Sequence, residues 1–175
     1  MVDLKSSIVE KNDGSFLIKV DLNKFNALSD FDKFQFIHER NHNQSWSKRI
    51  NEIDFTNMNK SQRALYCLYV IVGDIDNGGF IQFFQNTKEY FFEEGKKAFK
   101  LIGDIKTLKL FEKAIEIYFR NKEFLSAEDL DAPLNEDDEE ILEKLESEFY
   151  KLDDDREKLI YDFINKNIDD FLLTS

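Results

Sequence analysis

The stretch SQRALYCLYVIVGDIDNGGFIQFFQN, residues 61–86, decides the fold of this chain. From Ala64 to Val72 it is apolar on almost every face of a helix, a pattern typical of a helix at the centre of a core. Gly78 and Gly79 end that helix, because adjacent glycines permit positive φ angles or a close approach between helices. The phenylalanines that follow predict a short helix directed into the same core.

Helical periodicity continues on both sides of this stretch. Upstream, the pattern predicts a helix that Ser29 caps, and Asn57 or Asn59 can cap the central helix. Thr87 can cap the next helix, and Gly103 fits the position just past its end. The expected helices cover 29–42, 45–53, 61–74, 80–86, 87–102, 104–119, 136–152 and 154–173. We therefore expect an all-α single domain over 1–175, with about six to eight helices.

Each of the longer helices has an apolar stripe that we expect to face the core. The stripes comprise Phe31, Phe34, Ile37 and His38; Leu108, Phe111, Ile115 and Tyr118; Ile141, Leu142, Leu145 and Phe149; and Leu159, Ile160, Phe163, Ile164 and Ile168.

The remaining segments are less regular. SSIVEK and SFLIKV flank Asn12-Asp13-Gly14, a turn signal that predicts a short β-hairpin or an irregular arm within 1–27. The segment 121–135 contains the only proline, Pro133, and is expected to be a loop.

Composition narrows the class of protein. The chain has 18 Phe and 6 Tyr but only 1 Pro and 1 Cys, which favours long elements around an aromatic core. A lone Cys67 excludes an internal disulfide and, within LYCLYVIV, is expected to be a buried hydrophobe. The first residues contain no apolar signal-peptide core, and no stretch approaches the roughly 18 apolar residues of a membrane span. We expect a cytoplasmic protein.

The charge is concentrated at one end of the chain. Residues 123–175 contain 19 acids and 5 bases, a net of −14, whereas residues 1–122 contain 17 acids and 19 bases, a net of +2. The two sum to the net charge of −12. The negative electrostatic field of such an acidic region repels nucleic acid and membrane surfaces and attracts basic proteins.

The carboxylates of the closing helices could form an acidic ridge. Side chains at i and i+3 or i+4 on a helix stand about 5–6 Å apart, which is comparable to the spacing of phosphates on a nucleic-acid strand. The candidate ridge comprises Glu136, Glu139, Glu140, Glu143, Glu146, Asp153, Asp154 and Asp155. The ordinary alternative is a solvated helix face with no partner.

The most specific local signal is the glycine turn with its flanking amides and aromatic residues. It comprises Asn77, Gly78, Gly79, Phe80, Gln82, Phe83, Phe84 and Asn86. With Arg63 and Tyr66 before it and Leu101-Ile102-Gly103 after it, this pattern resembles the DMP19-like (DUF4375) family over roughly 59–171. We expect the turn itself to determine the fold rather than to form a binding site.

The resemblance implies an all-helical, dimeric protein without catalytic activity or a cofactor. A member of that family acts as a DNA mimic, in which acidic side chains stand in for phosphates and bind a DNA-binding transcription factor. The resemblance does not identify which carboxylates would do so here. Another function that would use the same acidic surface is that of an immunity or inhibitor protein for a basic toxin or nuclease.

One pattern points to a different class of protein. His38-Glu39-Arg40-Asn41-His42 spells H-E-x-x-H, in which two histidines can bind zinc and the glutamate can act as general base of a peptidase. These are the only two histidines, so a third ligand would have to be a carboxylate, with Glu52 or Asp54 nearest. The helix is expected to end just after His42, which disfavours a zinc metallopeptidase but leaves it as the alternative function.

Overall fold

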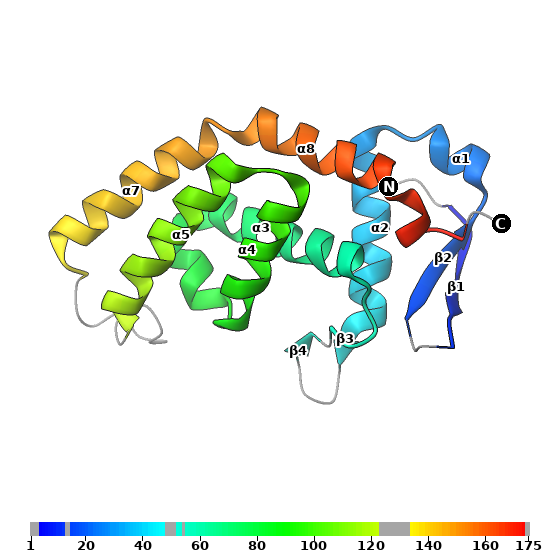
Figure 1. Ribbon diagram of the computed structural model, residues 1–175, viewed down its shortest axis with the longest axis horizontal. Helices are drawn as coiled ribbons and strands as arrows, with labels where there is room; N and C mark the ends of the chain where they lie inside the picture. Colours follow the sequence, from blue (N-terminus) through cyan, green and yellow to red (C-terminus); the bar gives the residue numbers. More distant parts are fainter. Residues whose placement is uncertain (1–3, 13–14, 48–51, 54, 123–133, 174–175) are drawn as a thin grey trace. The chain divides into compact units, whose positions relative to one another are not determined.

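The computed structural model describes residues 4–12, 15–47, 52–53, 55–122 and 134–173. These residues form seven α-helices, one 3₁₀-helix and two small antiparallel sheets, so the predicted helical fold with an N-terminal hairpin is confirmed (Figure 1). The contacts divide the chain into two compact units. The terminal unit comprises 1–66 and 160–175, and the central unit comprises 67–159. The single domain over 1–175 stays a prediction.

A hairpin of β1 (Ser6–Glu10) and β2 (Phe16–Val20) begins the terminal unit. The turn residues at 13–14 lie outside the described part of the structure. The free edge of β2 pairs with the end of the chain: the Ile18 amide donates to the Phe171 carbonyl at 2.9 Å, and the Leu173 amide donates to the Ile18 carbonyl at 2.9 Å. Residues 171–173 therefore extend the sheet that the hairpin starts.

Two helices follow, α1 (Leu22–Asn26) and α2 (Asp30–Ser45). Ser29 caps α2 as predicted, because its hydroxyl accepts a hydrogen bond from the Asp32 amide at 3.1 Å. Ile37 and His38 are buried, but Phe31 is 54% exposed, so its place in the predicted core stripe was wrong. Phe31 lies six residues before Ile37, and six residues are not a whole number of helical turns.

The predicted helix over 45–53 is also wrong. Trp46–Ser47 (β3) and Glu52–Ile53 (β4) instead form a short antiparallel ladder in which Trp46 pairs with Ile53. A nine-residue segment with few good helix formers gains too little from helical hydrogen bonds to offset the cost of nucleation, so pairing across the chain prevails.

Helix α3 (Lys60–Asn86) is the central element of the fold. The Asn59 side chain, not Asn57, caps it by accepting from the amides of Ser61 and Gln62, each at 3.0 Å, and Gln62 Oε1 accepts from the Asn59 amide at 3.0 Å. Cys67 is buried, as predicted. Of the described helices, α3 alone is long and apolar enough to cross a membrane, and half of its apolar window is buried inside the protein.

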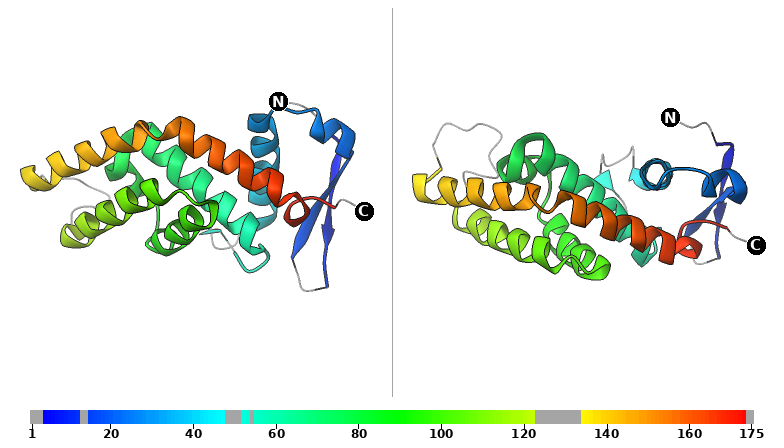
Figure 2. Two further views of the ribbon diagram at one scale, coloured as in Figure 1. Left: turned by 45° about the horizontal axis from the view of Figure 1, so that its top comes forward. Right: turned by 90° about the horizontal axis from the view of Figure 1, so that it is seen from above.

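The central unit packs the later part of α3 with α4 (Tyr90–Ile102), α5 (Ile105–Arg120) and α7 (Glu136–Tyr150). Helix α5 lies between α4 and α7 and contacts both (Figures 1 and 2). Helix α8 (Asp153–Lys166) begins in this unit, and η1 (Ile168–Asp170) follows it in the terminal unit.

The ends of α4 test two predictions. Gly103 follows the helix with a φ of 83°, as predicted. Thr87 does not cap α4; its hydroxyl donates instead to the Phe83 carbonyl at 2.6 Å, so it satisfies the end of α3. Thr87 could serve either end because it stands between the two helices.

Aromatic rings fill the core of the central unit. Phe84 and Phe92 each contact Tyr118, with ring centroids 5.0 and 4.8 Å away, and Phe83 lies 5.5 Å from Phe111. Leu142, Leu145 and Phe149 bury the inner face of α7, but Ile141 is 41% exposed, which corrects its predicted core position. Ile141 stands at the edge of that stripe, next to solvent.

Candidate functional site: the glycine turn and the acidic helix

The glycine turn breaks α3 into two helices. Gly78 has φ −168°, an extended value open to any residue, whereas Gly79 has φ 74°, in the left-handed region that favours glycine. A Cβ on Gly79 would lie 2.2 Å from Glu146 Oε1, and a Cβ on Gly78 would lie 2.2 Å from Gln82 Oε1. A side chain at either position would therefore clash with a close neighbour. At position 79 the left-handed backbone conformation also favours glycine.

The neighbour of Gly79 is a hydrogen-bond partner of the turn. Glu146 of α7 accepts from the Phe80 amide through Oε1 at 2.8 Å, across 66 residues of sequence. This amide opens the second half of α3, where a carboxylate is favourable because the first amides of a helix have no internal partner. Glu146, predicted as a ridge residue, therefore lies half-buried at the turn.

Tyr150, one turn further along α7, binds the other side of the break. Its hydroxyl donates to the Ile75 carbonyl at 2.9 Å, and Ile75 is fully buried. The carbonyls at the end of a helix have no internal partner either. One face of α7 thus supplies an acceptor to the start of the second helix and a donor to the end of the first.

The other residues of the turn motif support the same structure. Gln82 Nε2 donates to the Asp74 carbonyl at 3.5 Å, and Asn86 Nδ2 donates to the Asp74 carboxylate at 3.3 Å. The three phenylalanines are buried, while the Asn77 side chain is exposed. These contacts all lie within the fold, which fits a role of the motif residues as fold determinants; that role stays a prediction.

Helix α7 carries eight carboxylates and one lysine, a net of −7. Asn135 caps it by accepting from the Asp137 amide at 2.9 Å, and the four acids of the first turn complement the helix dipole. Glu136, Glu139, Glu140 and Glu143 are all exposed, and Glu136 and Glu143 each lie three or four residues from Glu139 and Glu140. They form a continuous acidic row on α7.

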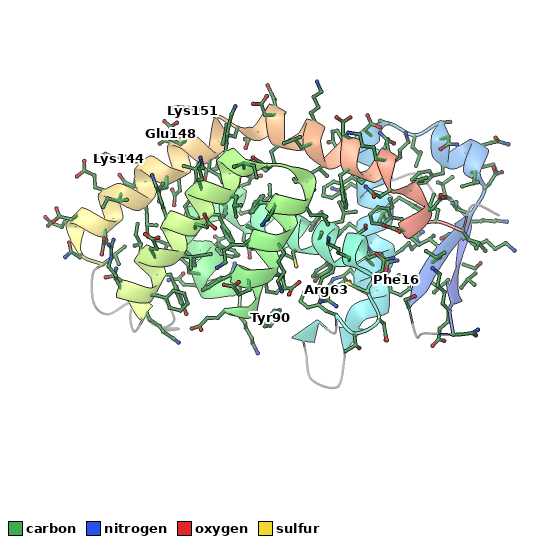
Figure 3. All side chains as sticks on the ribbon, viewed as in Figure 1. Phe16, Arg63, Tyr90, Lys144, Glu148 and Lys151 are labelled. Carbon is green, nitrogen blue, oxygen red and sulfur yellow. The ribbon has the colours of Figure 1, made fainter. Side chains whose placement is uncertain are left out.

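Ion pairs neutralise part of the predicted ridge. Five carboxylates of α7 and α8 pair with bases: Glu140 with Lys144 at 2.6 Å, Glu148 with Lys151 at 2.5 Å, Asp138 with Arg120 at 2.5 Å, Asp155 with Lys106 at 3.2 Å, and Asp153 with Arg156. Figure 3 labels Lys144 and Glu148 on α7 and Lys151, the residue that follows the helix. The exposed pairs among these contribute little to stability, whereas Arg156 is buried. No ion pair to a described residue involves Glu136, Glu139, Glu143 or Asp154.

Arg156 is a functional candidate that sequence reasoning missed. It is 2% exposed, its guanidinium carbon lies 3.8 Å from the Phe149 ring centroid, and Nη1 donates to the Phe149 carbonyl at 3.2 Å. Burial lowers its pKa, while Asp153 and Asp76 act in the opposite direction. The only sequence signal is a single base within DDDRE, which periodicity cannot distinguish from a solvated residue.

Carboxylates around the turn are held in a partly desolvated setting. Burial raises the pKa of Asp74, Asp76 and Glu146 above their ordinary values. For Glu146 the hydrogen bond from the Phe80 amide lowers the pKa, and the nearby charge of Glu143 raises it. The negative charge of Glu143 on α7 therefore acts on the carboxylate that binds the turn.

The H-E-x-x-H residues lie in the terminal unit and pack against a tyrosine. The imidazole of His38 stacks on Tyr66 with centroids 5.5 Å apart, His42 stacks at 6.0 Å, and His42 Nδ1 lies 3.3 Å from the Tyr66 hydroxyl. Burial, followed by the charge of His42, lowers the pKa of His38 to about 4. Glu39 pairs with Arg40 at 3.1 Å.

Among the residues that the structure describes, no third candidate metal ligand joins His38 and His42. Within the described residues, no group of three His, Cys, Asp or Glu side chains could hold a metal ion. Asp54 and the side chain of Glu52 lie outside the described part of the structure.

Comparison with known protein families gives a match that includes both the glycine turn and the acidic helix. A family model described as DMP19-like protein matches residues 56–167, which contain α3, α4, α5, α7 and α8 up to its end. No curated protein and no solved structure matched the chain. The match confirms the resemblance expected over 59–171 and covers well over half of the sequence, so this chain belongs to the DMP19-like protein family.

Proposed function

We propose that this chain is a non-enzymatic cytoplasmic protein that binds a basic, DNA-binding protein through α7 and competes with DNA for it. The observation that carries this proposal is the acidic row on α7, three of whose members pair with no described base. Its presence in a DMP19-like chain, whose last 53 residues hold 19 acids and 5 bases, makes mimicry of phosphates the best-supported role.

The spacing of the row supports mimicry of a single strand. Glu136 and Glu143 are seven residues apart, so four carboxylates occupy about 10 Å of helix axis, or one carboxylate per about 3.5 Å; one of the four, Glu140, is paired with Lys144. One strand of B-DNA carries a phosphate about every 3.4 Å of axis. A surface evolved to contact phosphates along one strand therefore meets a similar linear density of charge on α7.

The test uses the protein as bait in the lysate of its own cells. The first variant carries Glu136→Gln, Glu139→Gln and Glu143→Gln. A matched control carries Glu112→Gln, Glu116→Gln and Asp162→Asn, which remove the same charge from exposed positions outside α7. Capture is compared at about 0.1 M and about 1 M salt, between which the Debye length falls from about 10 Å to about 3 Å.

The proposal predicts that the wild type and the control capture a DNA-binding protein at low salt, and that the α7 variant does not. DNA that carries the binding site of the captured protein should displace it. Equal capture by the α7 variant, or a captured partner that DNA does not displace, would contradict mimicry. Capture of a basic nuclease or toxin, inhibited on binding, would assign the chain to the immunity class instead. The predicted homodimer is checked separately by light scattering.

A further inference from the structure

We propose that the glycine turn of α3 is a socket for α7, and that Glu146 and Tyr150 are positioning residues that set which carboxylates of α7 face outward. The break in α3 exposes a donor, the Phe80 amide, and an acceptor, the Ile75 carbonyl. Glu146 and Tyr150 fill these two positions at 2.8 and 2.9 Å. We call this pair of contacts the latch.

The latch fixes both the rotation and the axial position of α7. Each residue of an α-helix advances about 1.5 Å and turns about 100°. A slip of α7 by one residue would therefore rotate both side chains away from the turn and break both bonds together. Two bonds made one turn apart to the same break allow only one register.

The latch lies on the same side of α7 as the acidic row. Glu139, Glu143, Glu146 and Tyr150 are separated by four, three and four residues, the spacing that aligns side chains along one face of a helix. The N-terminal part of this face carries the carboxylates Glu139 and Glu143, and its C-terminal part carries Glu146 and Tyr150, which bind the socket. The register of the latch therefore determines where Glu139 and Glu143 point.

Glu143 and Glu146 also communicate through charge. A carboxylate that accepts from an amide binds more strongly when ionised, and the charge of Glu143 disfavours the ionised form of its neighbour. A cation placed on Glu143 by a partner would relieve that repulsion and tighten the bond to Phe80. By thermodynamic reciprocity, a tight latch then favours the partner. This last step rests on the proposed function; the latch itself does not.

Amide hydrogen exchange at Phe80 tests the latch without any partner. Glu146→Ala is expected to speed exchange of that amide about tenfold, because it deletes the acceptor of a charge-assisted hydrogen bond. Glu146→Gln, which keeps an oxygen acceptor, is expected to have a smaller effect. The matched control Glu143→Ala is expected to leave the Phe80 amide protected. Equal protection of Phe80 in the wild type and Glu146→Ala would overturn the proposal.

Tyr150→Phe provides a second test because it deletes one hydroxyl without changing charge. If both residues hold one register, Tyr150→Phe also speeds Phe80 exchange, and NMR titration shows the pKa of Glu146 returning toward its ordinary value. The double variant with Glu146→Ala then loses less stability than the sum of the two single variants. Additive losses, together with an unchanged Glu146 titration, would show two independent contacts and refute a shared positioning role.

These results separate from those of the capture experiment. If the α7 triple variant captures its partner normally while the latch variants still change Phe80 exchange, the proposed function fails and the latch stands. If capture depends on the acidic row but Phe80 exchange ignores Glu146 and Tyr150, the latch fails and the proposed function stands.

Discussion

Gly79 shows how one residue can be required twice. Its φ of 74° disfavours any side chain, and the space where a Cβ would sit is occupied by the Glu146 carboxylate. Gly103 has a similar φ of 83° but open space around it. Comparing substitutions at the two glycines therefore distinguishes the cost of backbone strain, which both share, from the cost of a steric clash, which only Gly79 has.

Gly79→Ala is expected to destabilise the protein by about 2–4 kcal/mol, because about 1–2 kcal/mol of left-handed strain adds to displacement of the Glu146 carboxylate. Gly103→Ala should show only the strain, about 1 kcal/mol. Urea unfolding of both variants measures the difference. Equal losses would mean that Glu146 moves aside without consequence.

Glu146 gives the central unit an unusual pH dependence. Because its pKa is raised in the fold, the folded state binds protons more readily than the unfolded state, so its contribution increases as pH falls from neutral through the folded pKa toward about 4.5. Glu146→Gln should remove that gain, which unfolding curves at several pH values would show. Glu148→Gln, an exposed α7 substitution, serves as the control and should keep the wild-type slope.

His38 has the opposite effect on the terminal unit. Its pKa falls from 6.5 to about 4, so the stability it contributes is complete above about pH 6.5 and is lost as pH falls toward 4. A shift of this size corresponds to an upper limit of about 3 kcal/mol. Hydrogen exchange in α2 at pH 7 and pH 5 would detect the loss, and His38→Gln should flatten it. An unchanged slope would place the acid sensitivity elsewhere.

Arg156 joins two helices at their adjoining ends. It binds the last turn of α7 through the Phe149 carbonyl and the first turn of α8 through Asp153. Near it, one carboxylate oxygen of the buried Asp104 has no hydrogen-bond partner within the described part of the chain. Removing the guanidinium would leave these acids without their only buried cation within the described residues.

Arg156→Ala is expected to cost about 3–5 kcal/mol, the usual loss when one member of a buried charged group is removed. Arg156→Lys should recover only part of it, because an ammonium cannot replace the planar fork that reaches two acceptors. Lys158→Ala, at an exposed position of α8, is the control and should be nearly neutral. Thermal unfolding of the three variants checks this order.

Sequence predicted the long helices because their signals are local. Ser29, Asn59 and Gly103 act within a few residues of the helix ends that they define. The ladder of β3 and β4 and the use of Thr87 by α3 depended on competition between neighbouring elements, which a pattern does not resolve. The latch could not be predicted from the sequence, because Glu146 binds Phe80 across 66 residues. In addition, the sequence of an acidic helix does not distinguish a carboxylate that faces solvent from one that binds a turn.

Charge acts on the whole molecule through self-repulsion. With a net of −12 and a net of −7 on α7 alone, added salt should stabilise the fold by screening like charges. The triple variant Glu136→Gln, Glu139→Gln and Glu143→Gln should unfold a few degrees higher at low salt and gain less from added salt. The Glu112, Glu116 and Asp162 control should keep more of the wild-type salt response. Identical responses would mean that repulsion is not concentrated on α7.

The pairing of residues 171–173 with β2 has a consequence for synthesis of the chain. The central unit is one continuous segment, so it can fold while translation is still in progress. The hairpin is made first but must wait for its partner, because the backbone groups that bind Ile18 belong to residues 171–173, which are translated after the whole central unit. The nascent protein therefore carries an unpaired sheet edge until residue 173 has been made, and its hairpin matures after its middle.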